Sequence, residues 1–593
     1  MLEPIWRVYR QYALTYWGWY LAGFLCLYGT NWLSVKIPLE LGKGIDLLEQ
    51  GGASSDVIAA ALTIGWMGLG VIVIRTLSRV LIFTPGRYVE HDLRRAVFDH
   101  VLKLQKVDRQ AFSAGDMVSR TANDITIARA LVGFGTMQVV NVAVALGLTG
   151  HEMWKLSPKL TLYAAVPVVL GVLAMQGGIR AIFTLTRKLQ ELLADLSEQV
   201  LASFQGVGVV KGFVAQPAFE KRFEERSEGL LRAGVRLAMI GGFFQPLMGV
   251  AASIALFFLL AVGGPLAIEG DVSVGQIAAF AAYLLYIVPP LRSMGWLISV
   301  VQRGRASLER IFGLLDLSVD RPERDKPQAL PSGSLGFRIR GLDFSYPDDS
   351  DAFALQGLSL EFQPGESTGI FGLTGCGKTT LCRLLTRVFN AEPGQIELVG
   401  ADGAVDLSAV DLDAYRRRLA VVPQVPFLFT ETLAENVRLG SPYDETRLRE
   451  ALQSAAMERD LHQLPDGDQT IVGERGILLS GGQRQRVALA RALYRPADLI
   501  VLDDVLSAVD HGTENQLVQT LRGVGRGEGH TPPTMIVVSH RVSALAHCDR
   551  IVVLDQGRLI DEGRHSELIK RPGLYAEAWK KQSDPATSQE VDA

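Results

Sequence analysis

The sequence predicts two units of different fold class: an all-α membrane unit of six helices, followed by an α/β unit. Long apolar stretches are confined to the part of the 593-residue chain before about residue 305. The remainder has the shorter apolar runs and glycine-rich turns of a water-soluble α/β domain, including a glycine-rich loop between a strand and a helix. The whole chain is 48% hydrophobic with a mean hydropathy of +0.20, which is high for a soluble protein.

A polar, proline-rich stretch separates the two units. It contains four prolines or glycines among charged residues and predicts a linker over residues 318–333. We therefore expect a transmembrane domain at 1–317 and an α/β domain at 334–580. The polar end of the chain, residues 581–593, is expected to be a disordered tail.

Charge and cysteine content exclude some functions. The net charge of −4 argues against nucleic acid as a partner. The four cysteines lack metal-ligand spacing and imply no disulfide framework. Because three of them lie in the α/β half, they fit a reducing cytosol.

Six apolar stretches are long enough to cross a bilayer, which takes roughly 20 residues of helix. They are Trp17–Ile37, Val57–Phe83, Met137–Met153, Leu160–Phe183, Met239–Ile268 and Ile277–Val301. The third is short and contains two polar residues. The alternative, buried helices of a soluble protein, does not fit six runs of this length. The first stretch is too long for a cleavable signal peptide.

Basic residues predict the orientation of the spans. The long connections after the second and fourth spans each carry eight lysines or arginines, whereas the opposite connections are short and hold few cations. Positive charge favours the cytoplasmic side, so both long connections and both chain ends are expected there. Met1–Tyr16 mixes aromatic and basic residues, which is typical of a helix lying on the membrane surface. We expect a multi-pass protein of the inner (plasma) membrane.

Two further features of this half indicate function. Gly115–Asp124 and Lys211–Glu220 lie near the tips of the long connections and are predicted to couple the two units, the alternative being ordinary turns. Polar residues in or near the spans predict a substrate cavity, although the arginines, close to the cytoplasmic ends, could instead extend to the membrane surface. These polar residues are Arg75, Arg79, Gln176, Arg180 and Gln245.

The second half of the chain contains a predicted phosphate-binding loop. Gly372-Leu-Thr-Gly-Cys-Gly-Lys-Thr379 follows a predicted strand and precedes a helix that starts at Thr380. Glycines such as Gly372, Gly375 and Gly377 let backbone N–H groups converge on phosphate oxygens. Lys378 supplies a positive charge, Thr379 offers its hydroxyl to Mg²⁺, and the helix N-terminus favours the anion.

Further motifs follow in order and support nucleotide chemistry. Gln424 follows a predicted strand and could reach Mg²⁺ or water, and His540 follows another strand and could bind the γ-phosphate. Asp503, after the apolar run that begins at Leu499, is predicted to hold Mg²⁺. Tyr346 is predicted to stack on adenine, although a lone aromatic is more often part of a core.

A second phosphate cradle opens a later helix. Leu479-Ser480-Gly481-Gly482-Gln483 places a serine and two glycines at a helix N-terminus. One chain cannot easily use two such cradles on one γ-phosphate. The sequence therefore predicts a head-to-tail pair of domains, in which each lends this loop to the nucleotide of the other, with Asp510 at the seam.

These segments resemble the conserved motifs of an ATP-binding cassette (ABC) transporter. Gly372–Thr379, Gln424, Leu479–Gln483, Leu499–Asp503, Ser507–Asp510 and His540 look like its Walker A, Q-loop, signature, Walker B, D-loop and switch histidine. Behind six spans they resemble an exporter half-transporter. Thr470–Gly476 resembles the exporter cross-loop, and Gln424–Phe429 with Leu502–Asp510 resembles the multidrug-resistance-like (Mdl) subfamily of bacterial heterodimers. The resemblance implies ATP and Mg²⁺ as cofactors.

Asp504 departs from the family pattern. The resemblance implies a glutamate there, which polarises the attacking water, and aspartate is shorter by about 1.5 Å. A misplacement of about 1 Å can cost about a hundredfold in rate. We therefore expect a slow site in one half of a heterodimeric exporter of amphipathic or lipid-like compounds, whose partner supplies a faster site. A homodimeric exporter or lipid flippase, and an ATP-gated regulatory membrane protein, remain alternatives.

Overall fold

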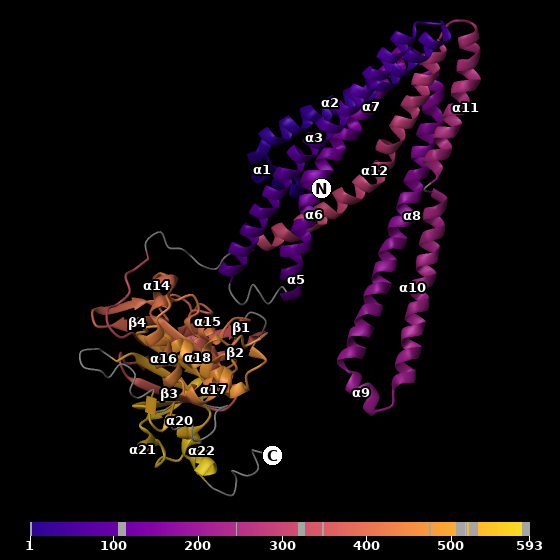
Figure 1. Ribbon diagram of the computed structural model, residues 1–593. Helices are drawn as coiled ribbons and strands as arrows, with labels where there is room; N and C mark the ends of the chain where they lie inside the picture. Colours follow the sequence, from indigo (N-terminus) through magenta and orange to yellow (C-terminus); the bar gives the residue numbers. More distant parts are fainter. Residues whose placement is uncertain are drawn as a thin grey trace. The chain divides into compact units, whose positions relative to one another are not determined.

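The computed structural model describes residues 3–104, 114–244, 246–317, 327–346, 349–473, 476–505, 516–517, 519–520 and 532–583. The side chains of residues 114, 176, 179, 180, 248 and 349–353 are not described. The chain divides into two compact units, the first helical and the second built on strands (Figure 1). Much of the predicted linker at 318–333 lies outside the described residues, so the domain boundaries stay a prediction.

The first unit is a set of long helices. They are α1 (Glu3–Gln11), η1 (Ala13–Tyr16), α2 (Trp17–Glu49), α3 (Ser54–Lys103), α5 (Ala114–Ser119), η2 (Arg120–Asp124), α6 (Ile125–Ala130), η3 (Leu131–Gly135), α7 (Thr136–Leu156), α8 (Pro158–Gln205), α9 (Val207–Gly212), α10 (Gln216–Phe244), α11 (Leu247–Ile268) and α12 (Val274–Leu315). α5 to α7 form one continuous helical run, which passes through two π-helical segments, η2 and η3.

Each predicted span lies on these helices. Five helical stretches of the described residues are long and apolar enough to cross a membrane: α3, the run that ends with α7, the first part of α8, α10 with α11, and α12. α2, which contains the first predicted span, is not among the five although it has 33 residues. Its three tryptophans and two tyrosines lower its hydropathy, and such residues concentrate where a helix meets the membrane surface.

α8 and α10 form a long antiparallel pair. They run side by side down to the short helix α9 in Figure 1. At 1.5 Å per residue, the 48 residues of α8 span roughly 70 Å, more than twice the thickness of a bilayer core. Ser157 caps the start of α8, where its hydroxyl accepts a hydrogen bond from the N–H of Leu160 at 3.4 Å. This hairpin includes the predicted coupling segment at 211–220.

Both ends of α12 are tied to other helices. At its start, the Asp46 carboxylate accepts hydrogen bonds from the Ser273 hydroxyl and the Gly275 N–H at 2.7 and 2.6 Å. At its end, the Arg7 guanidinium of α1 binds both carboxylate oxygens of Asp316 at 2.7 Å. That hydrogen-bonded pair lowers the pKa of Asp316. The amphipathic helix α1 is thereby fastened to the end of α12.

The second unit contains two sheets. The antiparallel sheet has the order β2-β1-β4-β5, and the larger sheet has the order β10-β9-β3-β8-β7-β6. The strands are β1 (Gly336–Tyr346), β2 (Asp349–Phe362), β3 (Ser367–Phe371), β4 (Ile396–Gly400), β5 (Gly403–Asp406), β6 (Leu419–Val422), β7 (Leu499–Asp503), β8 (Thr534–Val538), β9 (Arg550–Asp555) and β10 (Arg558–Gly563). β9, β3, β8, β7 and β6 pair in parallel.

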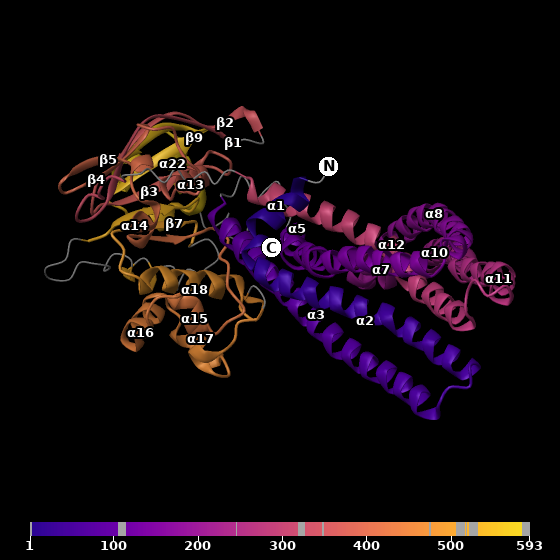
Figure 2. The same cartoon turned by 90° about the horizontal axis from the view of Figure 1, so that it is seen from above.

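Helices complete this unit. They are α13 (Lys378–Leu385), η4 (Leu407–Ala409), α14 (Leu412–Arg417), α15 (Leu433–Arg438), α16 (Glu445–Ser454), α17 (Glu458–Gln463), η5 (Gly467–Gln469), α18 (Gly481–Tyr494), α20 (Val542–Leu545), α21 (His565–Leu568) and α22 (Leu574–Ser583). Figure 2 shows α15, α16, α17 and α18 grouped together, apart from α13.

The larger sheet has a hydrophobic core on each face. In β7, Ile500 and Leu502 pack into one core with α15, α16 and α18, while Leu499 and Val501 pack into the other with α13 and β1. Successive side chains of a strand point to opposite faces, so a strand covered on both faces has an unbroken apolar sequence. This burial explains the apolar run before Asp503 and fixes the strand ends that carry the site.

The first three residues of the predicted disordered tail, 581–583, are helical. We expected it to start at residue 581, but α22 continues to Ser583. Gln582 accepts a hydrogen bond from the Val542 N–H at 2.8 Å and donates one to the His540 carbonyl at 3.0 Å. These contacts hold the last turn of the helix in place. The rest of the predicted tail lies outside the described residues.

Candidate nucleotide-binding site

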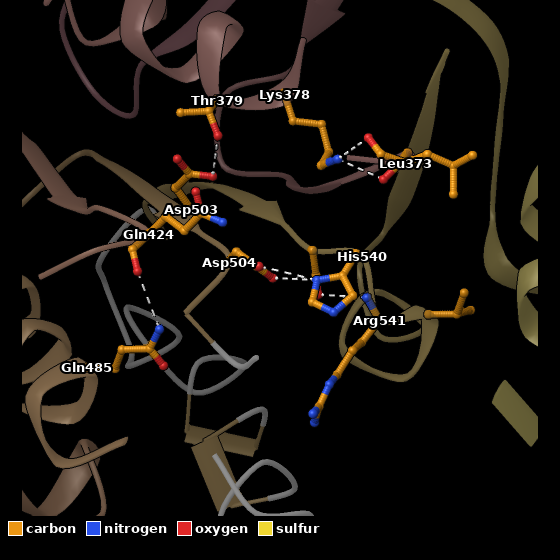
Figure 3. A network of polar contacts seen from close by, with 12 residues as sticks. Leu373, Lys378, Thr379, Gln424, Gln485, Asp503, Asp504, His540 and Arg541 are labelled. Carbon is orange, nitrogen blue, oxygen red and sulfur yellow. Dashed lines mark hydrogen bonds and ion pairs between the residues drawn. The ribbon is translucent and has the colours of Figure 1, made fainter. Parts of the chain in front are cut away.

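The predicted site residues follow four adjacent parallel strands. Gly372 follows β3, His540 follows β8, Asp503 ends β7 and Asp504 follows it, and Gln424 follows β6. Parallel strands present their carboxyl ends at the same edge of a sheet, where α/β proteins bind their ligands. Figure 3 shows Lys378, Asp503, Asp504, His540 and Gln424 gathered at this edge.

The loop after β3 requires glycine at defined positions. A Cβ atom on Gly372 would lie 2.4 Å from the carbonyl oxygen of Leu554, and one on Gly377 would lie 2.6 Å from that of Ala354. Gly377 also has a φ of 101°, a conformation that other residues rarely adopt. The backbone therefore passes so close to its neighbours that only glycine fits, as a loop that wraps phosphate requires.

We expect Gly372→Ala to weaken nucleotide binding by at least about tenfold, because the added methyl group must displace the backbone that would surround the phosphates. Fluorescence titration with a labelled ATP analogue measures this effect. The matched control is Gly573→Ala, where the new methyl group meets no atom within 4 Å. Equal affinities in the two variants would show that the loop does not hold the nucleotide.

Lys378 and Thr379 lie beside the loop. The Lys378 amine donates hydrogen bonds to the carbonyl oxygens of Gly372 and Leu373 at 2.7 and 2.8 Å (Figure 3). The Thr379 hydroxyl lies 3.4 Å from a carboxylate oxygen of Asp503. The amine also lies 3.6 Å from Sγ of Cys376. A charged amine whose partners are all neutral is readily redirected to an anion such as phosphate.

The side chains of Thr380 and Tyr346 contact each other. Their hydroxyl groups are 2.8 Å apart, and Thr380 is buried. The Tyr346 ring packs edge-on against Phe344 and Phe389, with centroids 5.3 and 5.4 Å away. Thr380 thus holds Tyr346 in place. The contact of Tyr346 with adenine and that of Thr380 with nucleotide stay predictions.

The Asp503 carboxylate is nearly enclosed, with 6% of the residue exposed. Burial raises the pKa of this carboxyl; the Thr379 hydroxyl opposes that shift, and the nearby charge of Asp504 adds to it. A cation at this point would offset the cost of the buried charge. A carboxylate beside a hydroxyl is an oxygen donor set that suits Mg²⁺. The described residues contain no group of three or more His, Cys, Asp or Glu that could hold a metal alone, so nucleotide oxygens must supply further ligands.

Asp504 contacts the switch-position histidine. Its two carboxylate oxygens lie 3.1 and 3.2 Å from Nδ1 of His540. The Asp504 N–H donates to the carbonyl of Val538 at 2.9 Å, and its φ of 54° lies in the left-handed region. The sheet therefore determines where this backbone turns, and the length of the side chain determines how far its carboxylate reaches.

The second phosphate cradle lies on the helical side of the unit. Ser480 is exposed and caps α18 in a reciprocal pair with Gln483, at 3.2 and 2.8 Å. The Gln483 amide also donates to Asp460 at 2.9 Å. In the described part of the chain, no hydrogen bond joins this cradle to the loop after β3. The two phosphate cradles are thus separate features of one domain.

Residues that position the site were missed at the sequence level. Buried Asp460 binds Arg486 at 2.8 Å and thereby supports the start of α18. The Gln485 amide approaches the backbone carbonyl of Gln424 at 3.5 Å. No local pattern distinguishes these side chains from ordinary polar residues of a helix surface. Ser507–Asp510, Gln245 and residues 474–475 of the predicted cross-loop lie outside the described residues, as do the side chains of Gln176 and Arg180.

Comparison with known families agrees with both halves of the chain. The family described as "ABC transporter transmembrane region" matches residues 20–291, and that described as "ABC transporter" matches residues 355–507. A relative from Bacillus subtilis, the probable multidrug resistance ABC transporter ATP-binding/permease protein YheI, is 30% identical, with 96% of each chain covered. This chain belongs to the ABC transporters.

Other relatives refine this ABC transporter assignment. The multidrug resistance-like ATP-binding protein MdlA of Escherichia coli is 29% identical, with 95% of this chain and 94% of MdlA covered. An ATP-dependent lipid A-core flippase of Thiobacillus denitrificans is 32% identical over 83% of each chain. A solved structure described as a bacterial Atm1-family ABC exporter with ATP bound has a TM-score of 0.77 at 25% identity, with 98% of this chain and 99% of that chain covered.

The predicted family and fold class are therefore confirmed. The protein is a multi-pass membrane protein of the exporter type, with a helical transmembrane region followed by an ATP-binding cassette. It binds ATP and couples ATP hydrolysis to transport across the membrane.

Proposed function

We propose that this chain is one half of a heterodimeric ABC exporter, in which its own ATP site is slow and its signature loop completes a faster site on the partner chain. The observation that carries the proposal is Asp504. Its carboxylate faces His540 of the same chain, with both oxygens 3.1 to 3.2 Å from one ring nitrogen. Only 13% of the Asp504 side chain is exposed.

A glutamate at this position would extend about 1.5 Å farther into the site. That extension separates two tasks, orienting the imidazole and polarising a water molecule. At the observed distance the aspartate orients the imidazole of His540, but its carboxylate does not reach far enough to polarise the water molecule. Because general-base catalysis depends first on reach, the site of Lys378 and Asp503 holds ATP and hydrolyses it slowly.

The exposure of the signature loop supports a role at the nucleotide of the partner chain. Ser480 and Gly481 are exposed at the start of α18, where N–H groups and the helix dipole attract phosphate. Large apolar side chains stand exposed on both cradles: Leu373 is 56% exposed on one, and Ile477 and Leu478, just before the other, are 77% and 66% exposed. Such side chains favour burial against a second cassette.

In this proposal the remaining residues have the roles of a cassette site. Lys378 neutralises the β- and γ-phosphates, and His540 binds the γ-phosphate. Mg²⁺ would be held by Thr379, Asp503 and the side chain of Gln424. When bound, the ion withdraws charge from the phosphate oxygens and orients them.

The raised pKa of Asp503 sets a pH dependence. Below that pKa the carboxyl is protonated and binds Mg²⁺ poorly, so we expect the magnesium-dependent gain in ATP affinity to shrink as the pH falls toward it from neutrality. A raised pKa also means that the charged form destabilises the fold at neutral pH. Asp503→Asn should therefore lose the magnesium dependence and raise the unfolding midpoint by about 2 °C. A lower midpoint at pH 7 would contradict this assignment.

The membrane-related proposals rest on the sequence. The distribution of basic residues supports cytoplasmic chain ends and a cytoplasmic ATP-binding domain in the plasma membrane. Relatives named for multidrug resistance and for lipid A-core transfer support an amphipathic or lipid-like substrate.

The test is purification of the tagged chain from its native membrane, followed by identification of its companion and assays of ATPase activity and vesicle transport. We expect a second half-transporter with glutamate after its Walker B aspartate, and transport only by the pair. Vigorous ATPase activity of this chain alone would overturn the heterodimer. ATP binding that changes conductance without driving uptake would instead indicate an ATP-gated regulator.

A homodimeric lipid flippase is the second candidate. It is favoured by the 32% identity to a protein named as a lipid A-core flippase. In that case the purified assembly would contain two copies of this chain, and Asp504 would support hydrolysis in both sites.

A further inference from the structure

The membrane unit contains a cavity of about 500 Å³ between α2, α3, α7 and α12. Its polar lining residues are Thr30, Asn31, Arg75, Ser78, Arg79, Gln138, Asn141 and Tyr286. None of the described residues that line it is acidic. A volume in this range accommodates a small molecule or the headgroup of a larger one.

Hydrogen bonds across the cavity wall engage the amide oxygens of Asn31 and Asn141. The Tyr286 hydroxyl donates to Oδ1 of Asn31 at 2.9 Å, and Nδ2 of Asn31 donates to Oδ1 of Asn141 at 3.1 Å. Gln138 donates to the Ser293 hydroxyl at 2.6 Å. The amide nitrogen of Asn141 has no hydrogen-bond acceptor among the described residues. The Asn141 amide can therefore donate a hydrogen bond to a ligand in the cavity.

Arg75 and Arg79 add two positive charges to this wall. They lie one turn apart on the same face of α3, within a strongly apolar helix, and neither forms an ion pair with a described residue. If these arginines only extended to the membrane surface, we would not expect a polar cavity beside them. Uncompensated charges in a membrane segment are costly and mark sites where a ligand supplies the opposite charge.

The depth of the pair restricts the ligand. At 1.5 Å per residue, Arg75 lies roughly 30 Å along α3 from Ser54. In the proposed orientation Ser54 is at the outer end of this helix, so Arg75 lies one bilayer-core thickness away from that end. That is the level of headgroups in the inner leaflet. Leu27 and Leu285, which also line the cavity, provide apolar contacts for an alkyl chain.

We propose that this cavity binds an amphiphile with an anionic, phosphate-type headgroup, which Arg75, Arg79 and the amide of Asn141 hold while its alkyl chain lies against the apolar wall. This assignment rests on the proposed exporter function and names the substrate class of that transporter. The planar guanidinium groups match the oxygens of a phosphate and bind them in pairs.

Binding of radiolabelled dodecyl phosphate tests the proposal. The purified transporter is placed in phosphatidylcholine nanodiscs without ATP. Dodecyltrimethylammonium, with the same alkyl chain, and inorganic phosphate, with no chain, are the competitors. We expect dodecyl phosphate to bind, the ammonium compound to compete at least tenfold more weakly, and inorganic phosphate to compete only weakly. Equal competition by the ammonium compound would overturn the anionic headgroup, and equal competition by inorganic phosphate would overturn the amphiphile.

Variants connect the binding to the cavity. Arg75→Ala and Arg79→Ala should each weaken binding at least about tenfold, whereas the corresponding lysine variants should lose less, because they keep the charge but not the paired hydrogen bonds. Asn141→Asp, which adds a negative charge but keeps the acceptor for Asn31, should also weaken binding. The control, Arg187→Ala, removes an arginine that is 84% exposed and paired with Glu191. Unchanged binding in both alanine variants and in Asn141→Asp would overturn the site.

A second measurement separates this inference from the proposed function. ATP-driven movement of dodecyl phosphate across vesicles reports on export, while nanodisc binding needs no hydrolysis. Binding that depends on the arginines, without ATP-driven movement, would contradict the export function and leave the site intact. Export of other amphiphiles without any binding of dodecyl phosphate would contradict the binding site and leave the export function intact.

Discussion

Ser480→Asp is expected to lower the ATPase rate of the assembled transporter at least about a hundredfold. Aspartate caps a helix as well as serine does, so the start of α18 should remain folded. Its negative charge, however, would face the γ-phosphate of the partner's nucleotide. The loss of one donor to a transition-state oxygen costs about 10²- to 10³-fold, and repulsion adds to that loss.

The matched variant is Lys378→Ala in the same chain, which disables only the slow site and should lower the rate less than about threefold. Ser480→Asn, which keeps the cap without the charge, should lie between the wild type and Ser480→Asp. Steady-state ATPase assays on the complete assembly in nanodiscs measure all three. Equally severe losses in Ser480→Asp and Lys378→Ala would favour two equivalent sites, as in a homodimer.

Asp504→Glu is expected to raise the hydrolysis rate of this chain's own site by about a hundredfold. The added methylene group moves the carboxylate about 1.5 Å toward the position of the attacking water, and errors of about 1 Å in such positions cost about a hundredfold. The backbone need not change, because the N–H of residue 504 is already bonded to Val538. Single-turnover hydrolysis with the partner's site disabled isolates this effect.

Asp504→Asn is the control for charge, and it should reduce the residual rate further while leaving ATP affinity within about twofold. A glutamate variant that hydrolyses no faster than the wild type would show that the reach of this carboxylate does not limit the site. The slow-site proposal would then fail, even if a second polypeptide were found in the assembly.

Much of the nucleotide site could be predicted from local sequence. The apolar run before Asp503 indicates a strand covered on both faces, and the glycines from Gly372 to Gly377 indicate a loop that passes close to other backbone atoms. Parallel strands align their carboxyl ends, so motifs that follow separate strands must converge. For that reason His540 and Asp504 are expected at one edge although 36 residues separate them.

Other contacts could not be predicted because they depend on packing between distant segments. Tyr346 and Thr380 are 34 residues apart and meet only because β1 lies beside α13. Asp460 supports Gln483 from another helix, and nothing in the residues around it indicates that contact. The extension of α22 past residue 581 depends on hydrogen bonds of Gln582 to a loop that follows β8.

The sequence by itself determined the family, the order of the two units, the helical membrane spans and the identity of the phosphate-binding groups, because those follow from hydropathy, periodicity and spacing along the chain. Only the tertiary structure decided that the Asp504 carboxylate ends on His540, and that Arg75 and Arg79 share a cavity with Asn31 and Asn141. Side-chain reach and the facing of helices are properties of three-dimensional packing. They fix which of the predicted polar groups can act together.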